Sequence, residues 1–376
     1  MVSARIRIVH SCLGTFSSKL ILVQSKDRRR LRNLIPYWDS LHTSLTPLAP
    51  GSESSKSNLW LSIILRTSAE AAMLQLIGQE SAMRTRVAVS VAIGLASAAF
   101  CWLLLAHFHQ GAADFTWAIR AARSMLAGRN PYDTPYQQYP LTAAFFALPF
   151  VWLRPELAGA LFYGVSSGLL AFGMTRHGYH RLLVFLAYPY WAGILTAQWA
   201  PLITASAFFP LLLPVTMAKP QIGLPVALNH LSRRGVVACL VVAVLSLIVM
   251  PHWPLWWAGQ FGYYQHFIPL LVLPGPLLAL ALLRLRDRDV FLLLTAAVMP
   301  QRWFFDALIL WLIPKTRREI VWTAGLSWGA GIWRWYHTPQ TMQQVGLWSV
   351  LFLYLPMLVV VLLRPADRQT KSVAAQ

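Results

Sequence analysis

Residues 111–149 read GAADFTWAIRAARSMLAGRNPYDTPYQQYPLTAAFFALP. This stretch is the longest polar interruption between apolar runs, and it carries two of the chain's 13 acidic residues, Asp114 and Asp133. An apolar run at 87–106 precedes it and another apolar run follows it. Long apolar runs separated by polar loops are typical of helices that cross a membrane. The stretch therefore predicts a structured loop outside the membrane, next to the first span.

The composition indicates a polytopic α-helical membrane protein. Of the 376 residues, 57% are hydrophobic and only 12% are charged, whereas soluble domains carry about 25% charged residues. The 17 Trp and 12 Tyr suit membrane interfaces. The net charge is +19, but the Lys and Arg lie in short clusters between apolar runs. That pattern favours cytoplasmic loops beside anionic lipids over nucleic-acid binding.

Residues 1–82 differ from the rest of the chain. They are richer in Ser and charge and have no apolar run near the ~18 residues of a span. We expect a poorly ordered extension, followed by a transmembrane domain at 83–366 and a cytoplasmic tail at 367–376. Met83 stands directly before Arg84, Arg86 and the first apolar run. One hypothesis is that Met83 is the natural start; the alternative is a genuine cytoplasmic extension.

Basic clusters set the predicted topology, because Lys and Arg favour the cytoplasmic side. Arg84 and Arg86 hold the start of the first span inside, which places the 107–139 loop outside. Keeping the later clusters inside requires about ten spans, several of them shorter than the ~17 residues of a straight crossing. These clusters are Arg176/Arg181, Lys219 with Arg233/Arg234, Arg284/Arg286/Arg288, Lys315/Arg317/Arg318 and Arg364/Arg368/Lys371. An outward-facing cavity is then the expected working site.

Within the outer loop, residues 114–127 alternate apolar and polar positions as in a helix lying on a surface, and Gly128 is expected to end it. Asp114 is the candidate general base, since a positioned carboxylate can accept a proton from a reacting hydroxyl. The alternative is that Asp114 caps the start of this helix. Asp133 follows Asn130 and Pro131 and is expected to form a turn.

Several other polar residues are candidates for substrate binding. Arg120 and Arg123 lie on one helical face and suit either a lipid phosphate or an interfacial anchor. Lys219 precedes Pro220, so it either holds a phosphate at a helix start or anchors the cytoplasmic side. Asp306 lies within WFFDALIL. An ionisable residue in a membrane stretch is usually functional or paired, and Arg302 is the expected partner.

Other chemistries find little support in the sequence. Gln198 either joins the site or caps the end of a span. His107 and His109 have no convincing metal partners, and the three cysteines predict neither a disulfide framework nor a zinc site. No nucleotide-binding or serine-hydrolase motif is present. The sequence thus predicts no metal and no cofactor.

Residues 113–153 resemble the first outer loop of glycosyltransferase family 87, whose members are membrane enzymes with a GT-C-type fold. The resemblance rests on Asp114-Phe115, residues 122–128, Pro131-Tyr132 and Tyr139-Pro140-Leu141. Weaker similarities fall on Ala197-Gln198, Lys219-Pro220 and Phe305-Asp306. The chain departs from the family in having Leu141 where a second Pro is common, and Ala197 in place of Gly. These departures bear on the substrate more than on the fold.

The resemblance implies a membrane mannosyltransferase of the cell envelope. It would move a sugar, mannose first among the candidates, from a polyprenyl-phosphate donor to a lipid or glycan acceptor on the extracytoplasmic face of the cell membrane. Asp114 would act as the general base, with inversion at the sugar. The donor-phosphate and substrate-binding residues would come from Arg120, Arg123, Gln198, Lys219, Arg302 and Asp306. The partners would be these substrates and membrane lipids, with no nucleic acid.

Two other classes remain open at this stage. A transporter or flippase for a lipid-linked or anionic solute would suit Asp306 and Gln198. A membrane scaffold without activity would leave the polar residues of the outer face unexplained. Asp114 discriminates between these classes, because a transferase should lose activity on Asp114→Asn, whereas transport should depend more on Asp306.

Overall fold

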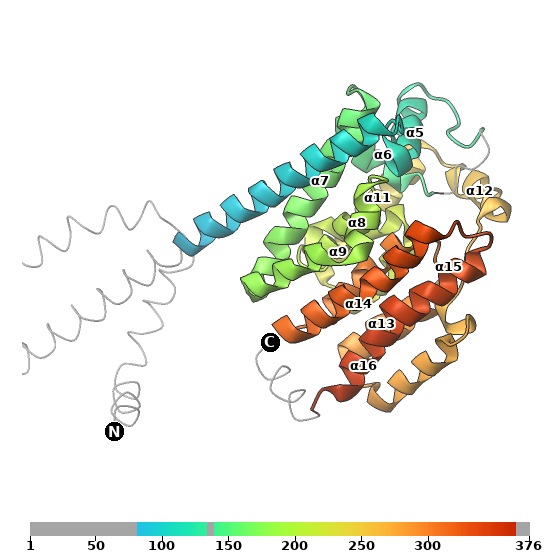
Figure 1. Ribbon diagram of the computed structural model, residues 1–376. Coiled ribbons are helices and arrows are strands. Elements are labelled where there is room, and N and C mark those ends of the chain that lie inside the picture. Colours follow the sequence, from blue (N-terminus) through green and yellow to red (C-terminus); the bar gives the residue numbers. More distant parts are fainter. Residues whose placement is uncertain (1–80, 134–138, 366–376) are drawn as a thin grey trace, which may run out of the picture. The chain divides into compact units, whose positions relative to one another are not determined.

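The computed structural model of the protein describes residues 81–133 and 139–365, all within one unit of the chain, Glu80–Gln376 (Figure 1). The described residues are helical and contain no β-strand, only an isolated bridge between Phe267 and Gln301. The prediction of an all-α protein is therefore confirmed. The extension at 1–82, with the Met83 start, and the tail at 367–376 fall almost wholly outside the described residues.

Three helices in the described part are long and apolar enough to cross a membrane. They are Ser81–His107, Pro155–His177, in which η3 (Thr175–His177) continues α7 (Pro155–Met174), and Met342–Leu363, which joins α15 (Met342–Ser349), η10 (Val350–Tyr354) and α16 (Leu355–Leu363). A fourth candidate joins α11 (Arg233–Val249) to Trp253–Tyr263, which holds α12 (Trp253–Ala258) and η6 (Phe261–Tyr263), with a bend of 96°. The chain is thus a helical membrane protein, but the predicted count of about ten spans is not confirmed.

The remaining helices are mostly short, because prolines interrupt the apolar runs. Pro189, Pro201 and Pro220 each stand in the first turn of a helix, where a missing N–H is harmless. The longest is α14 (Arg317–Tyr336), with charged side chains near both ends. The others are η1 (Ala113–Phe115), α5 (Thr116–Leu126), α6 (Thr142–Ala147), η2 (Leu148–Phe150), η4 (Tyr179–Leu186), α8 (Tyr188–Ile194), α9 (Ala200–Ser206), η5 (Pro210–Ala218), α10 (Pro220–Asn229), η7 (Pro269–Leu271), η8 (Gly275–Arg284), α13 (Arg288–Val298) and η9 (Phe304–Leu312).

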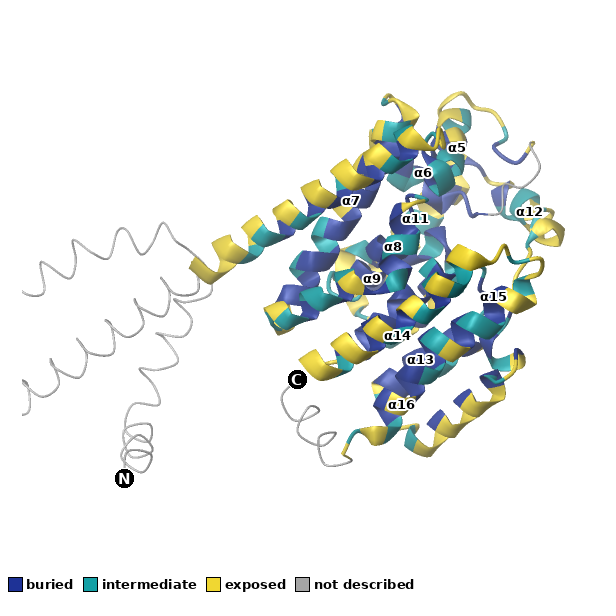
Figure 2. Ribbon diagram, viewed as in Figure 1, coloured by how far each residue is buried: buried dark blue, intermediate teal, exposed yellow. Residues whose placement is uncertain are grey.

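The helix Ser81–His107 lies beside α7 (Figure 1), and small residues form the contact between the two helices. A Cβ atom built on Gly164 would lie 2.6 Å from the Ala98 Cβ atom and 2.7 Å from the Gly94 carbonyl oxygen. Gly164 and Gly168 form a GxxxG pair, which lets two helices approach closely without a hydrophobic driving force. The other face of Ser81–His107 is largely exposed (Figure 2), as expected for a surface in contact with lipid.

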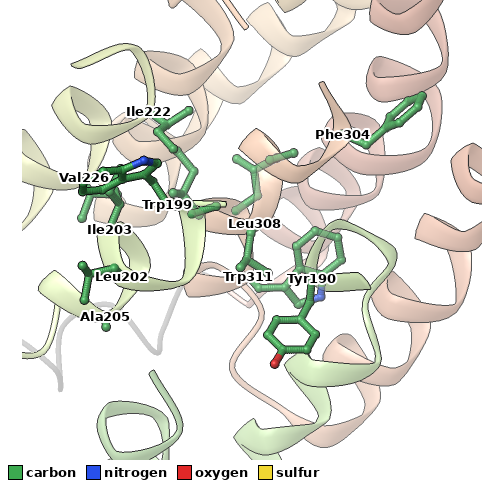
Figure 3. Packing of buried hydrophobic residues seen from close by; sticks show 14 of the residues in the cluster. Tyr190, Trp199, Leu202, Ile203, Ala205, Ile222, Val226, Phe304, Leu308 and Trp311 are labelled. Carbon is green, nitrogen blue, oxygen red and sulfur yellow. The ribbon is translucent and has the colours of Figure 1, made fainter. Parts of the chain in front are cut away.

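The core lies between the broken helices α9, α10 and η9. Trp199, from the turn before α9, and Trp311, from η9, are among the largest fully buried side chains. Figure 3 shows them in a common apolar cluster with Ile203 of α9, Ile222 of α10 and Leu308 of η9. This packing fixes the ends of three short helices relative to one another, and those ends carry the polar residues described below.

Basic clusters that are far apart in the sequence meet at one place. Asp289 at the start of α13 forms ion pairs with Lys315, at 2.9 Å, and with Arg364. Arg364 also pairs with Glu319 of α14 at 3.2 Å, and Arg181 donates a hydrogen bond to the Pro314 carbonyl oxygen. Several of the arginines and lysines that suggested loops on one side of the membrane are thus bound to carboxylates and carbonyl groups.

Candidate functional site

The predicted outer-loop helix is present as η1 and α5. It ends at Leu126, and Gly128 adopts a φ of +63°, the left-handed conformation common just beyond a helix end. Phe115 occupies the N-cap position of α5 and Ala112 that of η1, in each case without a side-chain cap hydrogen bond. The alternative role for Asp114, a helix cap, is therefore wrong. Ala113 has a φ of +46°, and this turn places the Asp114 side chain among residues from other elements.

Asp114 lies between a tyrosine and a lysine. The Tyr139 hydroxyl donates to both carboxylate oxygens, at 3.4 Å to Oδ1 and 3.3 Å to Oδ2. The Lys219 Nζ atom lies 3.8 Å from Oδ2, and the Asp114 side chain is 22% exposed. Burial, together with the negative charge of Asp114, raises the pKa of Tyr139 well above its ordinary value. Tyr139 therefore stays protonated and remains a hydrogen-bond donor to Asp114.

Lys219 is fully enclosed at the junction between η5 and α10, with its side chain 1% exposed. Its Nζ atom lies 2.9 Å from Asp306 Oδ1 and donates a hydrogen bond of 2.9 Å to Gln198 Oε1. Counting Lys219 among the cytoplasmic basic clusters is therefore incompatible with an outer Asp114, because the two side chains form an ion pair. Charge counting does not distinguish a buried lysine from a lysine in a loop.

Asp306 is completely buried at the start of η9. The expected partner Arg302 contacts Asp306 through its backbone, since the Arg302 N–H donates to Asp306 Oδ2 at 3.2 Å. The ion-pair partner of Asp306 is Lys219. The Arg302 guanidinium instead lies over the Tyr264 ring, 5.5 Å from its centroid, an arrangement that favours both groups.

The site is assembled from breaks between helices. Asp114, Gln198, Lys219 and Asp306 each lie at or next to the start of a short helix. Ala197, beside Gln198, has a φ of +47°, close to the φ of Ala113. Positive φ is uncommon for residues other than glycine, and such strain gathers at functional sites.

A cavity of about 930 Å³ opens beside this cluster, within the size range of small-molecule sites. Asp114 and Lys219 line it together with Arg302 and Arg334, so two arginines face the side on which Asp114 is accessible. Most of the wall is aromatic or apolar. The lining residues are Phe100, Leu104, Ala113, Asp114, Tyr139, Tyr188, Trp191, Ala192, Ile194, Leu195, Thr196, Gln198, Lys219, Arg302, Trp303, Phe304, Phe305, Trp328, Gly331, Arg334 and Trp335.

Two of the predicted phosphate-binding residues do not join the site. Arg120 and Arg123 are exposed on α5 and do not line the cavity. Arg123 donates to the Val151 carbonyl oxygen, at 2.7 Å from Nη2 and 3.1 Å from Nε, which suits the anchor interpretation. Asp133 accepts a hydrogen bond of 2.6 Å from Asn130, as a turn residue does.

The sequence interpretation gave no role to two residues of the cavity, Tyr139 and Arg334. Tyr139 was named only as part of the Tyr139-Pro140-Leu141 motif, although a residue directly before a proline has a restricted, extended backbone. Arg334 stands between Trp333 and Trp335 near the end of α14, far in sequence from the basic start of that helix. The sequence signal that could have identified Arg334 as a site residue was an isolated arginine between tryptophans at a helix end. In the described part of the chain, no group of three His, Cys, Asp or Glu side chains is placed to hold a metal ion.

No protein-family model matches the chain, and neither a curated protein nor a solved structure matches it. The resemblance to glycosyltransferase family 87 therefore rests on the residues quoted above, several of which the fold brings into contact.

Proposed function

We propose that this protein is a membrane glycosyltransferase that moves a sugar from a polyprenyl-phosphate donor to the hydroxyl group of a lipid or glycan acceptor. The observation that carries the proposal is the position of Asp114. Its carboxylate is partly exposed at the edge of a cavity of about 930 Å³. Two arginines and a largely aromatic or apolar wall line the same cavity, so one space offers a base, cations for a phosphate and an apolar surface.

In the proposed reaction, Asp114 accepts the proton of the acceptor hydroxyl as its oxygen attacks the anomeric carbon of the donor sugar. A new carbon–oxygen bond forms, and the bond between the anomeric carbon and the phosphate oxygen breaks. The polyprenyl phosphate leaves with the electron pair, and the configuration at the anomeric carbon inverts. Tyr139 supports Asp114 in this role, because its hydroxyl holds the carboxylate from the side of α6.

The leaving phosphate gains negative charge as its bond to the sugar breaks, so cations that face it lower the barrier. Arg302 and Arg334 are suited to this role, since both line the cavity. A guanidinium group can also bind two phosphate oxygens at once. We therefore propose Arg302 and Arg334 as the phosphate-binding residues. Arg120 and Arg123, on α5, do not line the cavity.

A lipid-linked donor fits the surroundings of the site. Phe100 and Leu104 come from the helix Ser81–His107, whose outer face is exposed along much of its length. A substrate delivered from the membrane needs no soluble nucleotide carrier. We further propose a GT-C-type bundle of about ten crossings, in which the short and broken helices are tilted or buried spans, with Asp114 on the extracytoplasmic side and mannose as the first donor sugar to test.

The transporter alternative drew on Asp306 and Gln198 as intramembrane polar residues. Asp306 is completely buried, is paired with Lys219 and does not line the cavity. Gln198 Oε1 accepts a hydrogen bond from the same lysine. Both residues are therefore occupied by internal contacts, whereas Asp114 keeps an accessible carboxylate, as a general base requires.

The test compares the purified protein with two matched variants in detergent. Asp114→Asn removes the proposed base, and Asp133→Asn makes the same chemical change at the exposed turn of the same loop. Transfer of radiolabelled mannose from polyprenyl-phosphate mannose to a lipid extract of the host is measured. We expect Asp114→Asn to lower the rate about 10²- to 10⁴-fold and Asp133→Asn to leave it unchanged. Equal loss in both variants would contradict the role of Asp114. Absence of transfer with mannosyl, arabinosyl and glucosyl donors alike would overturn the proposed reaction.

A further inference from the structure

The ammonium group of Lys219 is enclosed among polar and aromatic side chains of the protein. A lysine has three N–H donors. The Nζ atom donates to Gln198 Oε1 at 2.9 Å, forms an ion pair with Asp306 Oδ1 at 2.9 Å, and lies 3.8 Å from Asp114 Oδ2. The rings of Phe305 and Tyr139 cover the same nitrogen, at 4.9 and 5.6 Å from their centroids. Lys219 is therefore held by two carboxylates and an amide oxygen while its side chain is only 1% exposed.

The partners of Lys219 differ in their access to substrate. Asp306 is completely buried, whereas the side chain of Asp114 is 22% exposed and faces the cavity. The buried carboxylate holds the lysine, and the lysine is then positioned to act on the accessible carboxylate. The contacts thus form a chain that runs from Asp306 in the interior, through Lys219, to Asp114 at the cavity.

We propose that the Lys219–Asp306 ion pair is a positioning device that holds a cation against the Asp114 carboxylate and so fixes this carboxylate at the edge of the cavity. This inference rests on the proposed function only for the meaning of the proton transfer, because the geometry stands without it. Lys219 and Asp306 are positioning residues in this scheme. Neither needs to touch the donor or the acceptor.

Other charged and titratable groups also lie near Asp114. Their positions determine how strongly each substitution should affect the Asp114 carboxyl group. Tyr139, before α6, donates to the carboxylate. Arg302 and Arg334 contribute positive charge across the cavity, and Tyr264 lies under Arg302. The turn between α8 and α9 contributes two uncharged polar residues, Thr196 and Gln198. Lys219 is the nearest cation to Asp114 in this group, so its removal should have the largest effect.

The experiment labels protonated carboxyl groups with dicyclohexylcarbodiimide, a hydrophobic reagent, and follows the labelling of Asp114 by peptide mass spectrometry as the pH is changed. The reading is the pH at which half of Asp114 is labelled. Lys219→Gln removes the neighbouring cation, which favours the charged form of a carboxyl group, so we expect this pH to rise. Asp306→Asn leaves the lysine with Asp114 as its only anionic partner, so the same pH should fall.

The two variants also protect the test against misfolding. Lys219→Gln leaves Asp306 buried without its cation, a costly situation. Asp306→Asn removes that buried charge, so its downward shift can be measured even if the lysine variant does not fold. Lys315→Gln is the matched control, since Lys315 pairs with Asp289 at the same distance of 2.9 Å in another cluster. It should leave Asp114 labelling unchanged.

Opposite shifts in the two variants would establish the device. The same labelling profile in the wild type and Asp306→Asn, or an upward shift in Asp306→Asn, would overturn it. The labelling needs no sugar donor, so its outcome is independent of whether transfer is detected. Absence of transfer with shifted labelling would reject the proposed reaction alone. Transfer with unshifted labelling would reject the positioning role alone.

Discussion

The backbone N–H of Asp114 donates a hydrogen bond to the Thr196 carbonyl oxygen at 3.1 Å. This contact joins the loop after the first membrane helix to the turn between α8 and α9. It lies between two residues in the left-handed region, Ala113 and Ala197. The bond therefore links the backbone that carries Asp114 to the backbone that carries Gln198. The position of the candidate base depends on both turns.

Ala197 offers a direct test of this arrangement. Its φ of +47° is open to glycine without strain. We expect Ala197→Gly to keep transfer activity, with stability unchanged or higher by up to about 1 kcal/mol. Ala197→Val places a β-branched residue at positive φ, so stability should fall by roughly 2–3 kcal/mol, with loss of transfer. Thermal unfolding in detergent and the transfer rate measure both effects.

The control for this prediction is Ala187→Val. Ala187 is also completely buried, but its φ of −71° is ordinary. The valine there tests the crowding of a buried alanine without backbone strain. If Ala187→Val and Ala197→Val cost the same stability and activity, the strain at Ala197 has no part in positioning the site.

Substitution of the arginines that line the cavity should lower activity more than substitution of the arginines on α5. Arg334→Gln and Arg302→Gln remove cations that line the cavity, and we expect each to lower kcat/KM for the polyprenyl-phosphate donor about 10- to 100-fold. Arg120→Gln and Arg123→Gln should stay within about twofold, since surface anchors contribute little. Steady-state transfer at several donor concentrations measures the difference. A loss at Arg120 equal to that at Arg334 would contradict the assignment.

Much of the fold was predictable from local signals. The helix Ser81–His107 follows from an apolar run behind Arg84 and Arg86, and α5 follows from an amphipathic segment that stops before Gly128. The count of spans was less predictable, because prolines divide the apolar runs into helices too short to cross a membrane in straight form.

The site was predictable only in part. Asp114 could be selected because acids are rare in this chain and it lies beside the first span. The place of Lys219 could not be derived from charge counting, which carries no information on whether a lysine is buried beside carboxylates. The pairing of Lys219 with Asp306 is a contact between helix ends far apart in the sequence, and neither end has a periodic pattern that would reveal it. Such contacts are set by the packing of α9, α10 and η9.

Stability should depend on pH through Glu319. Burial alone would raise the pKa of this carboxyl, but hydrogen bonds from the Lys315 N–H and from Arg364 lower it on balance. A carboxyl group whose pKa is lower in the folded state than in the unfolded state stabilises the fold at pH values above its unfolded pKa. This stabilisation is lost as the pH falls through the folded-state pKa. We expect the wild type to unfold at lower temperature at pH 4 than at pH 7. Glu319→Gln should lower stability by about 1 kcal/mol at pH 7 and show a weaker pH dependence. Glu156→Gln, in the first turn of α7, is the control and should keep the wild-type profile.

Any side chain at Gly164 should weaken the packing of the first membrane helix against α7. A Cβ atom there would lie 2.6 Å from the Ala98 Cβ atom, so Gly164→Ala forces the two helices apart. We expect a loss of about 1–3 kcal/mol, seen as a lower unfolding temperature in detergent. Gly325→Ala is the matched control in α14, where a Cβ atom meets nothing within 4 Å; it should be neutral or stabilising by up to about 1 kcal/mol. Because the helix Ser81–His107 leads into the loop of Asp114, Gly164→Ala should also lower the transfer rate. Equal stability of the two variants would show that close approach at Gly164 does not hold this helix in place.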